Sequence, residues 1–179
     1  MNAPDPLATT SSSLHELWSP IEIRHIGGFG FPVDELVSNE ISIAKLGRDS
    51  SLKIFFGPGR RVVLSDGTEW RIKGANSGRH IVPVIKSAAG SVAFAGPLYG
   101  KRIYGITGRE FAYNLVPLGK VGIMTPGLWG IRDRQDEVGR LHQKAKRIEV
   151  TEPFPTAAAL LAFTLVTHGI PGENDLLPR

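Results

Sequence analysis

The feature that most constrains the fold is an uncharged, strongly apolar segment near the carboxyl end, residues 154–170 (FPTAAALLAFTLVTHGI). Pro153 and Pro155 fit a first helical turn, and Gly169 followed by Pro171 fits a C-terminal stop. Its apolar residues cover every face, so such a helix must be surrounded by protein or lipid. About 14 helical residues reach roughly 20 Å, which is shorter than a bilayer core of about 30 Å. We therefore predict a helix buried inside the protein.

Short apolar runs separated by turn residues precede this helix, as is typical of an all-β domain. Asp66-Gly67 between two such runs predicts a hairpin. A sheet of about eleven strands curls or closes, and a barrel of that size has a lumen wider than its own side chains can fill. We therefore expect a mainly β fold, a closed antiparallel β-barrel of about 11–12 strands around the buried C-terminal helix. The expected strands are 40–46, 52–56, 61–64, 69–73, 80–86, 91–95, 101–106, 110–116, 128–133, 137–141 and 147–150.

The chain is expected to form one barrel domain with two flanking segments. Residues 1–38 are interpreted as a flexible N-terminal arm and flap, 39–171 as the barrel with its central helix, and 172–179 as a C-terminal tail. No signal-peptide run is present in the first 30 residues, and no segment approaches 18 consecutive apolar residues. We expect a cytoplasmic protein without a transmembrane span, able to associate peripherally with a membrane.

Charge is unevenly distributed along the chain. Residues 1–50 carry a net charge of −4, residues 51–150 a net charge of +10, and residues 151–179 a net charge of −2. A basic, strand-rich middle attracts phosphate groups, anionic lipid or nucleic acid. The alternative is a solvated surface that its acidic flanks partly neutralise.

Three hairpin segments and the apolar segment after them resemble the tubby C-terminal-like superfamily, which includes tubby proteins, phospholipid scramblases and LURP-one-related proteins. The segments are RVVLSDGTEWRIKG, KRIYGITGREFAYNLVP, LWGIRDRQDEVGRLHQKAKRIEV and PTAAALLAFTLV. The resemblance implies a twelve-stranded barrel around a central hydrophobic helix. It also suggests the binding of phosphoinositide headgroups by basic residues on the barrel. The chain has neither the acidic Ca²⁺-binding segment nor the palmitoylated cysteines of scramblases, so the resemblance does not imply scramblase activity.

Basic residues gather at expected hairpin tips and could bind phosphate, with arginine offering two parallel hydrogen bonds. We expect a non-enzymatic binding module that engages anionic lipid headgroups or an acidic protein surface through these tips. The alternative interpretation is that polar tips only keep a barrel soluble. The candidate ligand-binding residues, nominated on charge alone, are Arg60, Arg61, Lys101, Arg102, Arg140, Lys144, Lys146 and Arg147.

Two other functions stay open. Tyr99 and Tyr104 flank Lys101-Arg102, a pattern that could bind nucleic acid by base stacking, although no known nucleic-acid-binding motif is present. Phe29, Phe31 and the N-terminal arm could instead bind a protein partner in a structural assembly.

Signals of catalysis are weak. The five histidines have no metal-ligand spacing, there is no G-x-S-x-G motif, and cysteine is absent. Gly57-Pro58-Gly59-Arg60-Arg61 lacks the lysine and hydroxyl residue of a phosphate-binding loop. His168 is interpreted as a helix cap. We expect no catalytic residue, metal or cofactor, and we expect the helix to fill the lumen so that no interior site remains.

Overall fold

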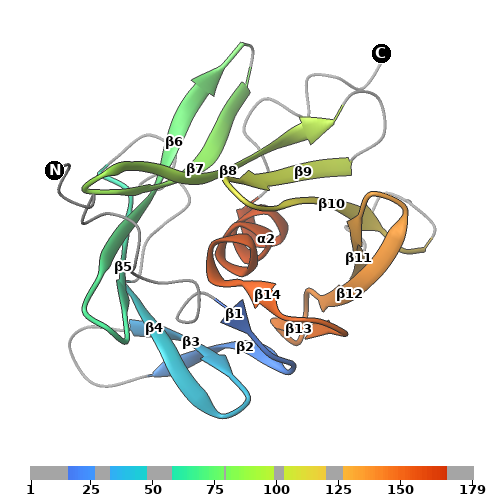
Figure 1. Ribbon diagram of the computed structural model, residues 1–179, viewed down its shortest axis with the longest axis horizontal. Helices are drawn as coiled ribbons and strands as arrows, with labels where there is room; N and C mark the ends of the chain where they lie inside the picture. The colour runs from blue at the N-terminus through green and yellow to red at the C-terminus, as the bar shows by residue number, and fades with distance from the viewer. Residues whose placement is uncertain are drawn as a thin grey trace, which may run out of the picture.

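The computed structural model describes residues 16–26, 33–47, 58–78, 80–98, 103–119 and 127–168. Twelve antiparallel strands form a closed barrel, and helix α2 (Thr156–His168) lies inside it (Figure 1). Neighbours in the chain are neighbours in the barrel, and β13 pairs with β2 to close it. The expected fold class is confirmed. The barrel strands are β2 (Ile21–Ile26), β3 (Val33–Ser38), β4 (Ile41–Gly47), β5 (Arg60–Leu64), β6 (Glu69–Ser77), β7 (His80–Ser87), β8 (Gly90–Leu98), β9 (Ile103–Gly108), β10 (Ala112–Pro117), β11 (Leu128–Asp133), β12 (Asp136–His142) and β13 (Arg147–Val150).

The core is formed by the inward-facing residues of the strands and by the helix. Alternate strand residues face the lumen, such as Val62 and Leu64 in β5, which are both buried. In α2 every residue from Thr156 to Val166 is buried. Removing a large apolar side chain from water contributes about 1.5–3 kcal/mol, so the helix and the barrel wall stabilise each other.

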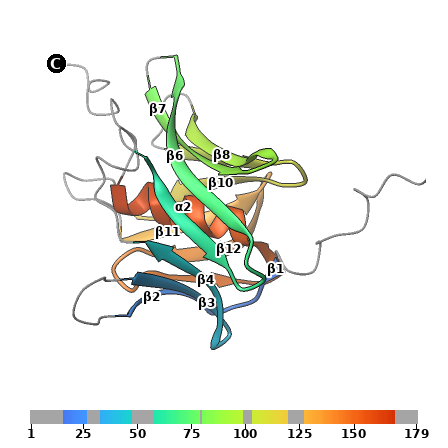
Figure 2. The ribbon, with the colours of Figure 1, turned by 90° about the vertical axis from the view of Figure 1, so that its left-hand side faces the viewer.

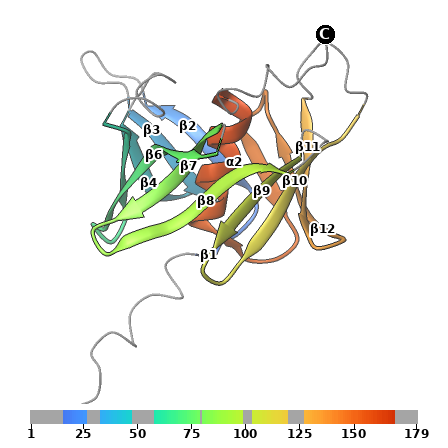
Figure 3. The same cartoon turned by 90° about the horizontal axis from the view of Figure 1, so that it is seen from above.

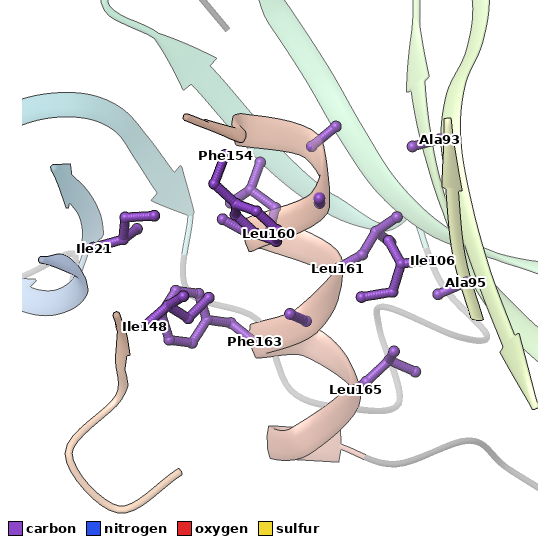
Figure 4. Close-up of a cluster of buried hydrophobic side chains, with 14 of the residues drawn as sticks. Ile21, Ala93, Ala95, Ile106, Ile148, Phe154, Leu160, Leu161, Phe163 and Leu165 are labelled. Carbon is purple, nitrogen blue, oxygen red and sulfur yellow. The ribbon is translucent and has the colours of Figure 1, made fainter. Parts of the chain in front are cut away.

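The helix does not pack equally against all strands. Its backbone comes closest to β7, β8 and β9. In β8 the buried residues are Ala93 and Ala95, whose small side chains permit this approach. Figure 4 shows Leu161 and Leu165 pointing toward Ile106 and Ala95. Residues on the opposite side of α2 and residues of β2 to β5 line a cavity.

The two ends of the barrel differ. At the end where α2 begins, here called the closed end, β1 (Glu16–Leu17) pairs with β14 (Phe154–Pro155). Leu17 and Phe154 are fully buried there. The Ser38 hydroxyl accepts a hydrogen bond from the Trp18 N–H at 2.8 Å and donates one to the Trp18 carbonyl at 2.7 Å. The end where α2 finishes is called the open end. Figure 2 and Figure 3 show α2 running lengthwise from the closed end to the open end.

The boundary expected at residue 38 is wrong, because β2 and β3 are barrel strands and not a flap. In β2, Ile21 and Ile23 face the core, as their alternation suggests. In β3 the consecutive residues Leu36, Val37 and Ser38 are all buried, so the alternation is lost. Beside them the register with β4 shifts, because Ile43 of β4 is an extra residue opposite Leu36 and Val37. The sequence of β3 therefore lacks the alternation that predicts the other strands.

The other expected elements lie close to their predicted positions. Strands predicted from residue 40 onward correspond to β4 to β13, except the strand predicted at 52–56, which lies outside the described residues. The Asp66-Gly67 hairpin is present, but only Gly67 has a positive φ, and its N–H donates to the Leu64 carbonyl at 2.9 Å. The helix begins at Thr156, after Pro155 has paired in β14.

Candidate functional site

A cavity of about 330 Å³ lies at the open end, between α2 and strands β2 to β5. Its floor includes Leu46 of β4 and Leu160 and Phe163 of α2, all of which are buried. Thr164 and Thr167 extend the same face of α2, because residues three or four positions apart share a helix face. The expectation that the helix fills the lumen is therefore wrong. By packing against β7 to β9, α2 leaves space on its opposite side.

Five ionisable side chains surround the mouth of this cavity: His25, Asp34, Arg60, Lys146 and His168. They come from β2, β3, β5, the turn between β12 and β13, and the last turn of α2. The barrel topology brings all five together, because each of these segments reaches the open end. A small apolar chamber is thus bordered by groups that donate and accept hydrogen bonds.

Asp34 connects two of these groups. The Arg60 Nη2 donates to Asp34 Oδ2, and His25 Nδ1 lies 3.1 Å from Asp34 Oδ1. The Arg60 Nε also donates to the Gly47 carbonyl at 2.7 Å. Since a guanidinium has five N–H donors, Arg60 retains donors beyond these two bonds. The carboxylate therefore holds an arginine and an imidazole in fixed positions beside the cavity.

The environment of Asp34 favours its ionised form. Burial of the carboxyl raises its pKa. The hydrogen bond with His25, together with the charge and the hydrogen bond of Arg60, lowers the pKa by more than burial raises it. The positive charge of Lys146 acts in the same direction, and the pKa ends below its ordinary value of 3.8. At neutral pH the cavity thus contains a carboxylate beside two permanent cations.

Gly59 determines how the strand carrying Arg60 begins. Its φ is +85°, and a Cβ at this position would lie 2.6 Å from the Ile72 carbonyl oxygen. No other residue adopts this conformation at such close approach without a shift of the backbone. Glycine therefore allows β5 to start against β6 with Arg60 directed at the cavity.

Lys146 is held over the cavity by its turn. Its N–H donates to the Gln143 carbonyl at 3.2 Å, and its carbonyl accepts from the Ile23 N–H at 3.0 Å. The Gln143 side chain donates to the Val166 carbonyl at 2.7 Å, which satisfies one of the last carbonyls of α2. The turn is thus attached to the barrel seam and to the helix. Within the described part of the chain, no carboxylate forms a salt bridge with Lys146.

The structure places only two of the eight predicted ligand-binding residues at this site, Arg60 and Lys146. Three others form ion pairs on the outer surface: Arg61 with Glu69, Arg140 with Glu137 at 2.6 Å, and Arg147 with Glu149 at 3.3 Å. Lys144 is exposed in the same turn as Lys146 but does not line the cavity. Lys101 and Arg102 lie outside the described residues.

Sequence reasoning missed His25, Asp34 and the contribution of His168. The signal was present in the alternation of β2, where Ile21, Ile23 and His25 fall on one face. Arg60, Val62 and Leu64 follow the same rule in β5. Arg60 and Arg61 are neighbours at the start of β5, but Arg60 faces inward and Arg61 faces outward.

Among the residues that the structure describes, no group of three or more His, Asp or Glu side chains is arranged to hold a metal ion. No helix in the same part of the chain is long and apolar enough to cross a bilayer.

The fold and the cavity define a class of architecture, an up-and-down β-barrel whose lumen holds one helix and, beside it, a small chamber open at one end. No protein-family model matches the sequence, and no curated protein or solved structure matches it.

Proposed function

We propose that this protein is a non-enzymatic binding module, and that the cavity at the open end binds the anionic headgroup of an amphiphilic molecule. The observation that carries the proposal is the convergence of Arg60, Lys146 and His25 on one chamber with an apolar floor. In this proposal the ligand binds inside the barrel mouth and not on the outer faces of the hairpin tips. The resemblance to tubby-like barrels stays a prediction that agrees with this proposal.

The geometry of Arg60 supports recognition of an oxyanion. Two fixed hydrogen bonds hold the guanidinium, and its side chain is only 13% exposed. Arginine held in this way loses little conformational entropy when it donates to a carboxylate or phosphate. Lys146 contributes a mobile ammonium that carries no salt bridge within the described residues. Bonds to charged groups contribute about 1.5–3 kcal/mol each.

The charge of the sequence also supports the proposal. Residues 51–150, which include Arg60 and Lys146, carry a net charge of +10. A cationic protein is attracted to an anionic surface.

The alternative of nucleic-acid binding has less support. Base stacking requires exposed aromatic rings near basic residues, but Tyr104, one of the two tyrosines proposed to stack, is buried, and Tyr99 lies outside the described residues. A chamber of about 330 Å³ also accommodates only a compact group, at the small end of the range for ligand sites. An acidic protein would contact the outer surface, where Arg61, Arg140 and Arg147 already have carboxylate partners.

Flotation with lipid vesicles tests the proposal. We compare vesicles of phosphatidylcholine alone with vesicles containing phosphatidylglycerol, for the unmodified protein and for Lys146→Gln. The matched control is Lys86→Gln, which removes the same charge from an exposed position of β7 near the closed end. We expect binding only to anionic vesicles, and an affinity about tenfold lower for Lys146→Gln than for Lys86→Gln.

Equal losses in the two variants would mean that general surface charge, and not the cavity, causes binding, and would contradict the proposal. Soluble dihexanoyl-phosphatidylglycerol and inorganic phosphate distinguish the source of the anion. Competition by the short-chain lipid alone indicates a lipid headgroup, whereas competition by phosphate at similar concentrations indicates a free anion. In this proposal the protein is cytoplasmic and reaches the membrane surface from solution.

A further inference from the structure

The cavity contains a carboxylate where a general anion site would have only cations. Asp34 is 18% exposed, lies against Arg60 and His25, and is ionised at neutral pH. Its negative charge offsets one of the two permanent cations, Arg60 and Lys146. These three groups together leave an excess of one positive charge, which a ligand with one negative charge balances.

The rest of the chamber requires an apolar group. Leu46, Leu160 and Phe163 form the floor, and each is buried by the protein that surrounds it. Ile23 lines the cavity beside this floor and is only partly buried, so a ligand consisting only of a charged group would leave its side chain in contact with water. Covering it with hydrocarbon contributes about 25 cal/mol per Å². The chamber thus fits a small charged head followed by a short length of chain.

We propose that the cavity selects amphiphiles with a single negative charge, a carboxylate or a phosphodiester, over phosphomonoesters, and that Asp34 determines this selectivity. The inference rests on the proposed function and names its ligand class. A phosphomonoester carries about −1.5 to −2 charge at pH 7, so it would place additional negative charge close to the Asp34 carboxylate. At an effective dielectric constant of about 20, like charges about 6 Å apart repel strongly enough to change affinity tenfold or more.

Asp34 has a second role that the test must separate from the first. It positions Arg60 and His25 through hydrogen bonds, so removing the side chain would disturb both. Asp34→Asn keeps the size and one carbonyl acceptor while it removes the charge. Glu35→Gln is the matched control, since Glu35 is the next residue of β3, bonds Ser42 on the outer surface and does not line the cavity.

The experiment is a calorimetric titration with octanoate and with octyl phosphate at pH 8, where the two probes share a tail but differ by about one charge. We expect octanoate to bind the unmodified protein more tightly than octyl phosphate, and acetate to bind at least tenfold more weakly than octanoate. In Asp34→Asn the affinity ratio of octanoate to octyl phosphate should fall about tenfold, while Glu35→Gln should leave it unchanged.

The outcomes separate the two proposals. If neither probe binds the unmodified protein, the proposed function and this inference both fail. Suppose instead that both probes bind, that both bind Lys146→Gln more weakly, and that the ratio of their affinities is the same in Asp34→Asn as in the unmodified protein. The proposed site then stands, and the selectivity assigned to Asp34 is wrong. A thermal melt of each variant verifies that it folds. If Asp34→Asn does not fold, the unmodified protein alone still tests the inference, which is wrong if octyl phosphate binds more tightly than octanoate.

Discussion

Lys146 occupies a backbone conformation that glycine adopts more easily. Its φ is 49°, in the left-handed region, and Arg134 in the turn between β11 and β12 has a similar φ of 54°. A residue with a side chain pays about 1–2 kcal/mol for this conformation, whereas glycine gives up about 0.5–1 kcal/mol of chain entropy. Lys146 and Arg134 thus share a backbone conformation, but only Lys146 lines the cavity.

We therefore predict that two matched substitutions differ in their effect on binding. Lys146→Gly and Arg134→Gly should each change the free energy of unfolding by no more than about 1 kcal/mol. Only Lys146→Gly should weaken binding to vesicles containing phosphatidylglycerol, by about tenfold. Urea denaturation and flotation measure the two effects. Similar binding by both variants would show that Lys146 does not contribute to the binding site.

Asp34 should also give the stability of the protein a dependence on acidic pH. Its folded-state pKa is below the ordinary value of 3.8, so the folded state binds fewer protons than the unfolded state in this range. The resulting stabilisation is fully present above the ordinary pKa and is lost as the pH falls through the lower, folded-state pKa. Urea denaturation between pH 2.5 and 7 should show the difference between the unmodified protein and Asp34→Asn shrinking toward low pH. A constant difference would contradict the assignment.

At the scale of an element, α2 has one tightly packed face and one that borders a cavity. Leu161 and Leu160 are equally buried, but Leu161 points to Ile106 and Ala95 whereas Leu160 lines the cavity. A side chain beside empty space has fewer packing contacts to lose.

We expect Leu161→Ala to cost about 3–5 kcal/mol and Leu160→Ala about 2 kcal/mol, the lower part of the range for buried leucine. Urea denaturation of both variants measures the difference. Equal costs would indicate that the helix packs evenly on all sides and that no chamber exists beside it.

The elements themselves could be predicted where local rules apply without interruption. The apolar helix, with proline before it and glycine after it, and the alternating strands from β4 onward follow such rules. β3 could not be predicted in the same way, because its consecutive residues Leu36, Val37 and Ser38 are all buried and show no alternation. Without β3, β2 also had no partner and was interpreted as part of a flap.

At the scale of the whole molecule, the barrel positions the site. Its twelve strands bring His25, Arg60 and Lys146 to one end although they are far apart in the sequence. Charge alone indicated Arg60 and Lys146 but could not separate them from Arg61 and Arg140. That separation depends on which face of each strand is inward. The off-centre position of α2 depends on Ala93 and Ala95 in a distant strand, so the cavity could not be predicted from the helix sequence.

The most direct test of the account follows the backbone amide signals of the isotopically labelled protein while octanoate is added. The account predicts chemical-shift changes concentrated at Ile23, His25, Thr164 and Thr167, which surround the cavity. The amides of Arg61 and Arg140 on the outer surface should change little. Changes concentrated on that outer surface, with none at Ile23 or Thr164, would contradict the central claim that the ligand enters the barrel beside α2.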